Sequence, residues 1–235
     1  QGLGMFGSHS PLAGRLGPSV GRARGLGGVR GVGLAVPAVE DVVGRDVHET
    51  CPRLAGGTGD VAFRIVEASR GAAEGTVLDI NASMLGVGAE RAKKRGLDAN
   101  LVFVEGNAEA LDLPDSTFDA YTIAFGIRNV TDIPAALREA HRVLRRGGRF
   151  YCLEFSTTLW PGFAEIYDAY SHRLVPKLGK LLANDEDSYR YLIESIRRFP
   201  DMPTFERMIG EAGFVQTAVE PMLGGLVAIH SGWKI

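Results

Sequence analysis

The residues best suited to bind a ligand are a glycine-rich stretch and the polar residues that follow the next two predicted strands. The stretch AGGTGD at 55–60 precedes a segment with helical periodicity, and glycines there let the backbone approach a ligand at a helix N-terminus. Asp79 lies 20 residues beyond Gly59 at the end of a short apolar run, where a carboxylate can accept both hydroxyls of a ribose. Asn107 and Ala108 follow the next strand, where an adenine would lie, and Asn107 can hydrogen-bond it.

This spacing leaves two cofactors and one ligand-free alternative open. Gly57-x-Gly59-x-x-Ala62 satisfies the dinucleotide fingerprint GxGxxG/A, so both NAD and S-adenosylmethionine fit. A tight turn that binds nothing would use the same glycines. The candidate cofactor-binding residues are Gly57, Thr58, Gly59, Asp79, Asn107 and Ala108.

Alternating strands and helices have to position these residues. Short apolar runs predict strands at 76–80, 101–104, 120–125 and 149–155. Periodicity and capping residues predict helices from Asp60 to Gly71, from Ser83 to Gly96, and from Asp132 to Gly147. Strands that alternate with helices indicate a parallel α/β sheet.

The C-terminal part refines the fold class. Two further strands, at 214–220 and 225–231, flank Leu223-Gly224-Gly225, which is a hairpin signal. A parallel sheet that ends in an antiparallel hairpin is typical of the Rossmann-like class I methyltransferase fold rather than of a plain dinucleotide-binding fold. We therefore expect a mostly parallel, seven-stranded sheet.

Composition argues against several classes of protein. The 235 residues are 45% hydrophobic and 23% charged, which is ordinary globular usage and not that of a disordered or coiled-coil chain as a whole. A net charge of −2 argues against nucleic acid as a partner. No run reaches the roughly 18–20 apolar residues of a membrane span. With two cysteines and no His/Cys/carboxylate cluster of metal-ligand spacing, we expect neither a disulfide framework nor a metal.

Residues 1–50 differ in composition from the rest of the chain. They hold 12 of the 31 glycines and a single aromatic residue, and residues 1–39 contain four arginines without any acidic residue. Such a segment buries too little apolar surface to offset its ordering entropy, so we expect a disordered tail. The arginines also fit an organelle transit peptide, and non-native sequence is the alternative. The folded domain would then span 51–235.

The segments that hold these candidates resemble the S-adenosylmethionine-dependent C-methyltransferases of quinone biosynthesis. The resemblance covers about residues 54–235 and is most specific at AFGIRNVT (124–131) and LEFS (153–156). The Gly-Ile-Arg-Asn segment and the C-terminal His-Ser-Gly are most similar to the mitochondrial ubiquinone branch, and the bacterial members that also serve menaquinone come second. The other matching segments are 55–63, 79–81, 84–85, 106–109, 188–197 and 227–232.

The resemblance implies that S-adenosylmethionine donates a methyl group to a ring carbon of a polyprenyl benzoquinol. Arg128 and Asn129 are then the catalytic candidates, because a guanidinium stays protonated and can stabilise phenolate charge, while Asn129 can orient a water that takes the proton. Without such a role the two residues would form a structural turn with a surface ion pair. Tyr167 and Tyr170 lie in an amphipathic pattern over 157–182 and are the substrate-binding candidates, with a core-facing helix as the alternative.

The resemblance also implies partners and a location. The partners would be other ubiquinone-biosynthesis proteins in a multi-subunit complex, with peripheral contact to a membrane. The location would be the matrix side of the mitochondrial inner membrane. A bacterial cytoplasm or a plastid is the alternative location.

One segment departs from the family pattern. Pro52-Arg53-Leu54 stands where relatives place a strand of the type Leu-Asp-Val before the glycine stretch. Because proline removes a backbone donor, we expect an impaired first strand and little or no methylation by this chain. Two other functions stay open at this point: an inactive copy that acts as a scaffold in a quinone-biosynthesis complex, and an NAD-dependent oxidoreductase.

Overall fold

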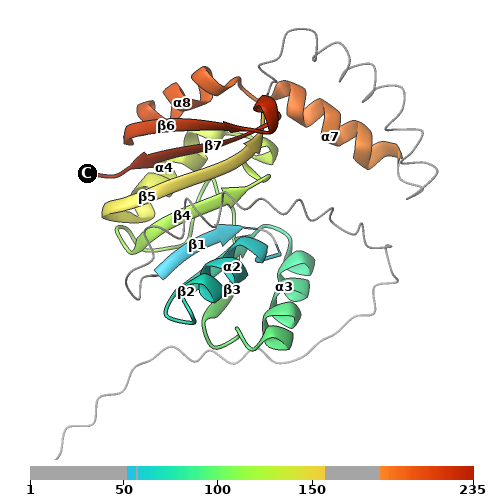
Figure 1. Ribbon diagram of the computed structural model, residues 1–235, viewed down its shortest axis with the longest axis vertical. Coiled ribbons are helices and arrows are strands. Elements are labelled where there is room, and N and C mark those ends of the chain that lie inside the picture. Colours follow the sequence, from blue (N-terminus) through green and yellow to red (C-terminus); the bar gives the residue numbers. More distant parts are fainter. Residues whose placement is uncertain (1–51, 57, 157–185) are drawn as a thin grey trace, which may run out of the picture. The chain divides into compact units, whose positions relative to one another are not determined.

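A computed structural model describes residues 52–56, 58–156 and 186–235, all within the compact unit Leu34–Ile235 (Figure 1). The strands are β1 (Pro52–Gly56), β2 (Glu74–Asp79), β3 (Leu101–Glu105), β4 (Phe118–Ala124), β5 (Leu144–Phe155), β6 (Val215–Met222) and β7 (Val227–Trp233). They form one sheet in the order β3-β2-β1-β4-β5-β7-β6. The first five strands pair in parallel, and β7 runs antiparallel between β5 and β6. The expected parallel sheet with an antiparallel hairpin at its end is therefore confirmed.

Helices connect the strands. They are α2 (Asp60–Ala68), α3 (Ala82–Arg95), α4 (Ile133–Val143), α7 (Glu186–Arg198) and α8 (Met202–Glu211). Two 3-10 turns, η1 (Ile127–Asn129) and η2 (Leu223–Gly225), follow β4 and β6. The helix α3 begins at Ala82, one residue before the predicted Ser83, because the Asn81 side chain accepts the N–H groups of the first turn; Gly96 ends it at φ 69°, as predicted.

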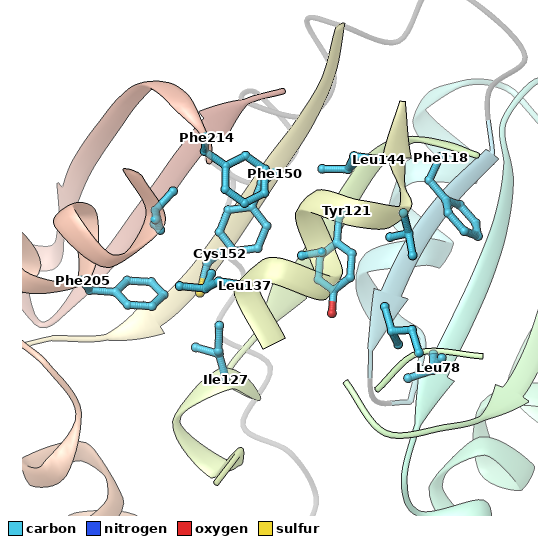
Figure 2. Close-up of a cluster of buried hydrophobic side chains, with 14 of the residues drawn as sticks. Leu78, Phe118, Tyr121, Ile127, Leu137, Leu144, Phe150, Cys152, Phe205 and Phe214 are labelled. Atoms are coloured by element: carbon cyan, nitrogen blue, oxygen red, sulfur yellow. The ribbon is translucent and has the colours of Figure 1, made fainter. Parts of the chain in front are cut away.

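The sheet is packed on both faces, as successive residues of β5 show. Phe150 and Cys152 belong to a buried cluster with Leu137 of α4 and Phe205 of α8 (Figure 2). Tyr151, the residue between them, belongs to a different buried cluster that includes Ile65 of α2. Because side chains alternate along a strand, the two clusters lie on opposite faces of the sheet.

Two helix boundaries differ from the prediction. Asp60 is the first residue of α2 and not its cap; Gly59 takes the cap position, and the helix ends at Ala68 rather than at Gly71. The helix α4 ends at Val143, before the predicted Gly147-Gly148, because Leu144 already pairs with Phe118 of β4.

The first strand forms in spite of its proline. Residues 52–56 pair in parallel with β2 over their whole length, and Arg53–Ala55 pair with β4. Pro52 is the first residue of β1 and its Cα is in register only with β2, so it occupies a position where a strand tolerates the missing donor. The expectation of an impaired first strand was therefore wrong for the backbone, and the expectation of little or no methylation, which depended on that impairment, is not kept.

Several predictions fall on residues outside the described ranges. These are the disordered tail at 1–50, Gly57, the amphipathic segment 157–182, and the substrate candidates Tyr167 and Tyr170. They stay predictions.

Candidate active site

The carboxyl ends of four parallel strands bring the candidate residues together. Gly56, at the end of β1, is in register with Leu78 of β2, and Asp79 is in register with Glu105 of β3. The N–H of Gly106 donates to the Asp79 carbonyl over 3.1 Å. This hydrogen bond joins the loop after β2 to the loop after β3. Ligands of open α/β sheets bind at this edge.

Gly59 shapes the first loop. It caps α2 with φ 82° and ψ 9°, a left-handed conformation that favours glycine. The hydroxyl of Thr58 donates to the Asp60 carboxylate over 2.8 Å, and Arg91 of α3 pairs with the same carboxylate. Thr58 therefore fixes the loop by an internal contact, and the loop presents the start of α2 to a ligand.

Gly88 of α3 lets this helix approach the glycine loop. A Cβ atom at this position would lie 2.9 Å from the Thr58 carbonyl oxygen and 2.7 Å from the Phe103 ring. Only glycine fits that approach, so α3 packs directly against the loop. This residue was not predicted, since a glycine inside a helix has no ligand-binding signature of its own.

The Asp79 carboxylate keeps one oxygen for a ligand. One of its oxygens, Oδ1, accepts the N–H of Asn81 over 2.9 Å, and the carboxylate makes no other hydrogen bond within the described ranges. Its half-buried position and its free oxygen suit two hydroxyl donors of an adenosine. The neighbouring Ile80 is 72% exposed, which leaves an apolar surface beside the carboxylate.

Asn107 and Ala108 lie in the turn after β3. The Oδ1 atom of Asn107 accepts the N–H of Glu109 over 3.0 Å, so the exposed side chain keeps its amide donors for a ligand. A ring nitrogen of adenine can accept such a donor. Gly59, Asp79 and Asn107 thus fit the cradle, ribose and base contacts of an adenosine cofactor, and each individual role stays a prediction.

The two catalytic candidates lie on η1, directly after β4. Ile127 begins this turn and is 1% exposed; Figure 2 shows it at the edge of the main buried cluster. Phe125, before the turn, has φ 55°. The buried Ile127 side chain and the left-handed backbone of Phe125 together fix the orientation of the turn that carries Arg128 and Asn129.

Arg128 forms a buried ion pair. Its Nη1 atom donates to Glu154 Oε1 over 2.6 Å and to the carbonyl oxygen of Phe125 over 2.6 Å. The exposed fractions are 10% for the arginine side chain and 0% for the glutamate. The ion pair of the structural alternative therefore forms, but it is buried and not at the surface; the choice between a structural and a catalytic role stays a prediction.

Glu154 is a site residue that the sequence analysis did not single out. It is the only acidic residue in the apolar run 149–155, and a carboxylate in a strand covered on both faces requires a partner. Burial raises the pKa of Glu154, and the neighbouring guanidinium opposes that rise. The contact with Arg128 favours the charged form of the carboxylate.

Asn129 is exposed and has a partner from a distant part of the chain. Its Oδ1 atom accepts the hydroxyl of Tyr191 of α7 over 3.1 Å. Tyr191 was also missed as a site residue, although it lies in the segment 188–197 that contributed to the resemblance. The turn after β4 is thus held by β5 on one side and by α7 on the other.

No described helix is long and apolar enough to cross a membrane. No group of three or more His, Cys, Asp or Glu side chains within the described part of the chain could hold a metal ion.

Comparison with known proteins gives the family. Residues 37–234 match the ubiE/COQ5 methyltransferase family. The "Ubiquinone/menaquinone biosynthesis C-methyltransferase UbiE" of Zymomonas mobilis is 60% identical over 182 residues, which cover 77% of this chain and 74% of that protein. The protein of the same name from Bartonella tribocorum is 58% identical over 182 residues and is covered to 70%.

Solved structures agree on the fold. A SAM-dependent methyltransferase from Aquifex aeolicus superposes with a TM-score of 0.58 at 15% identity, covering 84% of this chain and 89% of the other. Phosphoethanolamine N-methyltransferase 2 of Haemonchus contortus, solved in complex with S-adenosyl-L-methionine, gives a TM-score of 0.60 at 14% identity, covering 85% of this chain and 52% of the other.

The family decides between the two cofactors that the glycine spacing left open, and the methyl donor is S-adenosylmethionine. This chain belongs to the ubiE/COQ5 methyltransferase family and is an S-adenosylmethionine-dependent C-methyltransferase.

Proposed function

We propose that this chain methylates a ring carbon of a polyprenyl benzoquinol, of the 2-methoxy-6-polyprenyl-1,4-benzoquinol type, in ubiquinone biosynthesis. The relatives named above act in ubiquinone and menaquinone biosynthesis, and the Gly-Ile-Arg-Asn segment favours the ubiquinone substrate. The observation that carries the proposal is the buried Arg128–Glu154 pair beside Asn129, at the same sheet edge as Asp79. It supplies oriented hydrogen-bond donors next to the adenosine-binding loops.

The proposed chemistry assigns a task to each part of this edge. S-adenosylmethionine supplies an electrophilic methyl group; the ring carbon forms the new C–C bond as the S–C bond breaks, and the ring then loses a proton. Gly59 and Asp79 hold the donor, and a fixed donor and acceptor in near-attack geometry remove several kcal/mol from the barrier. A quinol carbon becomes a better nucleophile as its adjacent hydroxyl loses its proton.

Residues of the turn after β4 assist the removal of the proton from the quinol hydroxyl. Arg128 cannot accept it, because a guanidinium stays protonated. It donates a hydrogen bond to the quinol oxygen, where negative charge develops. Asn129 positions a water through its amide N–H groups, because its Oδ1 atom is engaged by Tyr191. The hydroxyl proton passes to this water and from there to bulk solvent, to which Asn129 is exposed.

The proposed substrate also indicates where the protein acts in the cell. A polyprenyl tail partitions into a membrane, so we place the chain at a membrane surface as a peripheral protein, in contact with other ubiquinone-biosynthesis proteins. The arginines without acidic residues in 1–39 support the matrix side of the mitochondrial inner membrane. Fractionation of intact mitochondria with a tagged full-length chain tests this placement, and a cytosolic signal would contradict it.

Methylation of two quinols tests the function. The full chain is incubated with S-adenosylmethionine and either a short-tailed 2-methoxy-benzoquinol or a short-tailed naphthoquinol, and the products are read by mass spectrometry. We expect one ring methyl on the benzoquinol and a much lower rate on the naphthoquinol. Preference for the naphthoquinol would indicate a menaquinone-type substrate, and no methylation of either would contradict a quinol substrate.

A further inference from the structure

The Glu154 carboxylate is enclosed by three donors. Its Oε1 atom accepts Nη1 of Arg128 over 2.6 Å and the N–H of Phe155 over 2.9 Å. Its Oε2 atom accepts the backbone N–H of Arg128 over 3.4 Å. The side chain is 0% exposed, so it cannot itself touch a substrate. Whatever Glu154 does for the reaction, it does through Arg128.

These contacts fix the guanidinium in one orientation. Nη1 donates to two acceptors at 2.6 Å, Glu154 and the Phe125 carbonyl. The Phe155 ring centroid lies 5.4 Å from Cζ of Arg128, within the range of a cation–π contact. A planar fork held at one nitrogen and stacked on a ring has little freedom left, so its remaining N–H groups point in fixed directions.

One of those N–H groups has no acceptor. Nε of Arg128 is buried and makes no hydrogen bond within the described residues, in a side chain that is 90% buried. A buried donor without a partner costs free energy, so such groups normally bind a ligand or a water. The orphaned donor belongs to the residue that the proposed function places next to the quinol oxygen.

The ion pair also changes what Arg128 offers to a substrate. An arginine alone would present a full positive charge to a phenolate. With the carboxylate at 2.6 Å, the pair is neutral as a whole and its long-range field largely cancels. What is left is a directed hydrogen bond from an oriented N–H group.

We propose that Glu154 is the positioning residue for Arg128: it cancels the net charge of the guanidinium and holds it so that an N–H group not bound to Glu154 or Phe125 donates to the oxygen of the quinol ring. This inference rests on the proposed function. Stabilisation by net charge and donation from an oriented N–H group predict opposite changes in rate when the Glu154 carboxylate is removed. If Arg128 acted by net charge, removal of the opposing carboxylate would raise the rate; if it acts as an oriented donor, the rate falls.

The variants Glu154→Gln and Glu154→Asp test that sign in the full-length chain. We expect Glu154→Gln to lower kcat by about tenfold or more, the scale of a lost oriented interaction, with KM for the quinol and Kd for S-adenosylmethionine nearly unchanged. Glu154→Asp, which keeps the charge, recovers part of the loss. An unchanged or higher kcat in Glu154→Gln overturns the proposal.

A matched control is available on α4. Glu139 also pairs with an arginine, Arg142, over 2.7 Å and accepts a backbone N–H, that of Leu111, but it contacts none of the site residues. Glu139→Gln should leave kcat unchanged. A loss as large as that of Glu154→Gln would attribute the effect to general destabilisation and overturn the assignment.

Two measurements keep the test decisive where activity or folding fails. In NMR spectra of the full chain with ¹⁵N-labelled arginine, Arg128 should show separate, slowly exchanging Nη signals that merge in Glu154→Gln; a freely rotating guanidinium in the parent contradicts the proposal even if no quinol is methylated. If Glu154→Gln does not fold, Arg128→Lys decides. It keeps the charge and loses the fork, so we expect it to lose turnover about tenfold or more, whereas parental turnover would overturn the proposal.

Discussion

The hydroxyl of Tyr191 donates to Asn129 Oδ1 over 3.1 Å, which joins α7 to the turn after β4 across 62 positions of the chain. The contact engages the acceptor atom of the Asn129 amide. The two amide N–H groups are then the ones that face outward to a water or a substrate oxygen. One hydrogen bond therefore sets the direction in which Asn129 can act.

Removal of that hydroxyl tests this relationship. Tyr191→Phe keeps the ring and loses only the hydrogen bond to Asn129. Loss of one neutral hydrogen bond is worth about 0.5–1.5 kcal/mol, so we expect kcat to fall about twofold to tenfold with little change in the Kd for S-adenosylmethionine. Steady-state kinetics and calorimetry check the two numbers. Equal kcat in the variant and the parent would mean that Asn129 does not need this orientation.

Arg128→Ala separates chemistry from cofactor binding. The side chain acts where charge develops in the transition state, so we expect turnover to fall about 10²-fold or more while cofactor affinity stays nearly intact. Since β1 forms in this chain, the test needs no repair of Pro52-Arg53-Leu54. Calorimetry with S-adenosylmethionine is the control for folding. Parental turnover in the variant would make the Gly-Ile-Arg-Asn segment structural.

Local patterns predicted the elements, and long-range contacts decided the rest. Strands β2, β3 and β4 and the C-terminal hairpin follow from short apolar runs and turn residues. The start of β5 was missed because residues 144–148 are extended through pairing partners that lie far away, such as Lys234, whose N–H donates to the Gly148 carbonyl over 3.0 Å. Local periodicity carries no information about such a partner.

In the candidate site, too, local patterns were predicted and long-range contacts were not. Glycine spacing and the acid after β2 indicated the cofactor residues, because each acts from its own loop. The Arg128–Glu154 pair joins residues 26 positions apart, and only the oddity of one acid in an apolar strand could have signalled it. Pairing across elements depends on the register of β4 and β5, which the sequence alone did not provide.

Asp79→Ala tests the ribose contact. We expect S-adenosylmethionine binding to weaken by about 1.5–3 kcal/mol, the scale of hydrogen bonds to a charged group. Calorimetry on the full chain gives the Kd directly. Asp98→Ala, an exposed acid after α3, is the matched control and should bind as the parent does. An unchanged Kd in Asp79→Ala would remove this residue from the site.

Gly88→Ala tests the support of the glycine loop by α3. The added Cβ would lie 2.9 Å from the Thr58 carbonyl oxygen, so the loop or the helix has to shift. Overpacking of this kind costs about 1–3 kcal/mol, and we expect both the stability and the affinity for S-adenosylmethionine to fall. Gly86→Ala is the control on the same helix, because its Cβ would meet nothing within 4 Å. Similar behaviour of the two variants would show that the loop tolerates the contact.

His230 predicts a pH dependence of stability. It lies in β7 with 1% exposure, its ring packs edge-on against Phe205 at 4.8 Å, and burial lowers its pKa to about 4. The unfolded chain, with a histidine pKa near 6.5, binds this proton at a higher pH than the folded chain does. The contribution of neutral His230 to the free energy of unfolding is therefore fully present above pH 6.5 and is lost as the pH falls toward 4.

The difference between the histidine pKa in the unfolded chain and the value of about 4 in the folded chain corresponds to about 3 kcal/mol of unfolding free energy. We expect the free energy of unfolding, from urea titrations at pH 7 and pH 5, to drop more in the parent than in His230→Gln, which does not titrate. The glutamine variant can be less stable at both pH values, because its buried amide also lacks partners, and the comparison uses only the slope with pH. His141→Gln, a half-buried histidine on α4, should change that slope less. If the parent and His230→Gln lose stability in parallel on acidification, His230 is not the group that titrates, and other groups set the acid sensitivity.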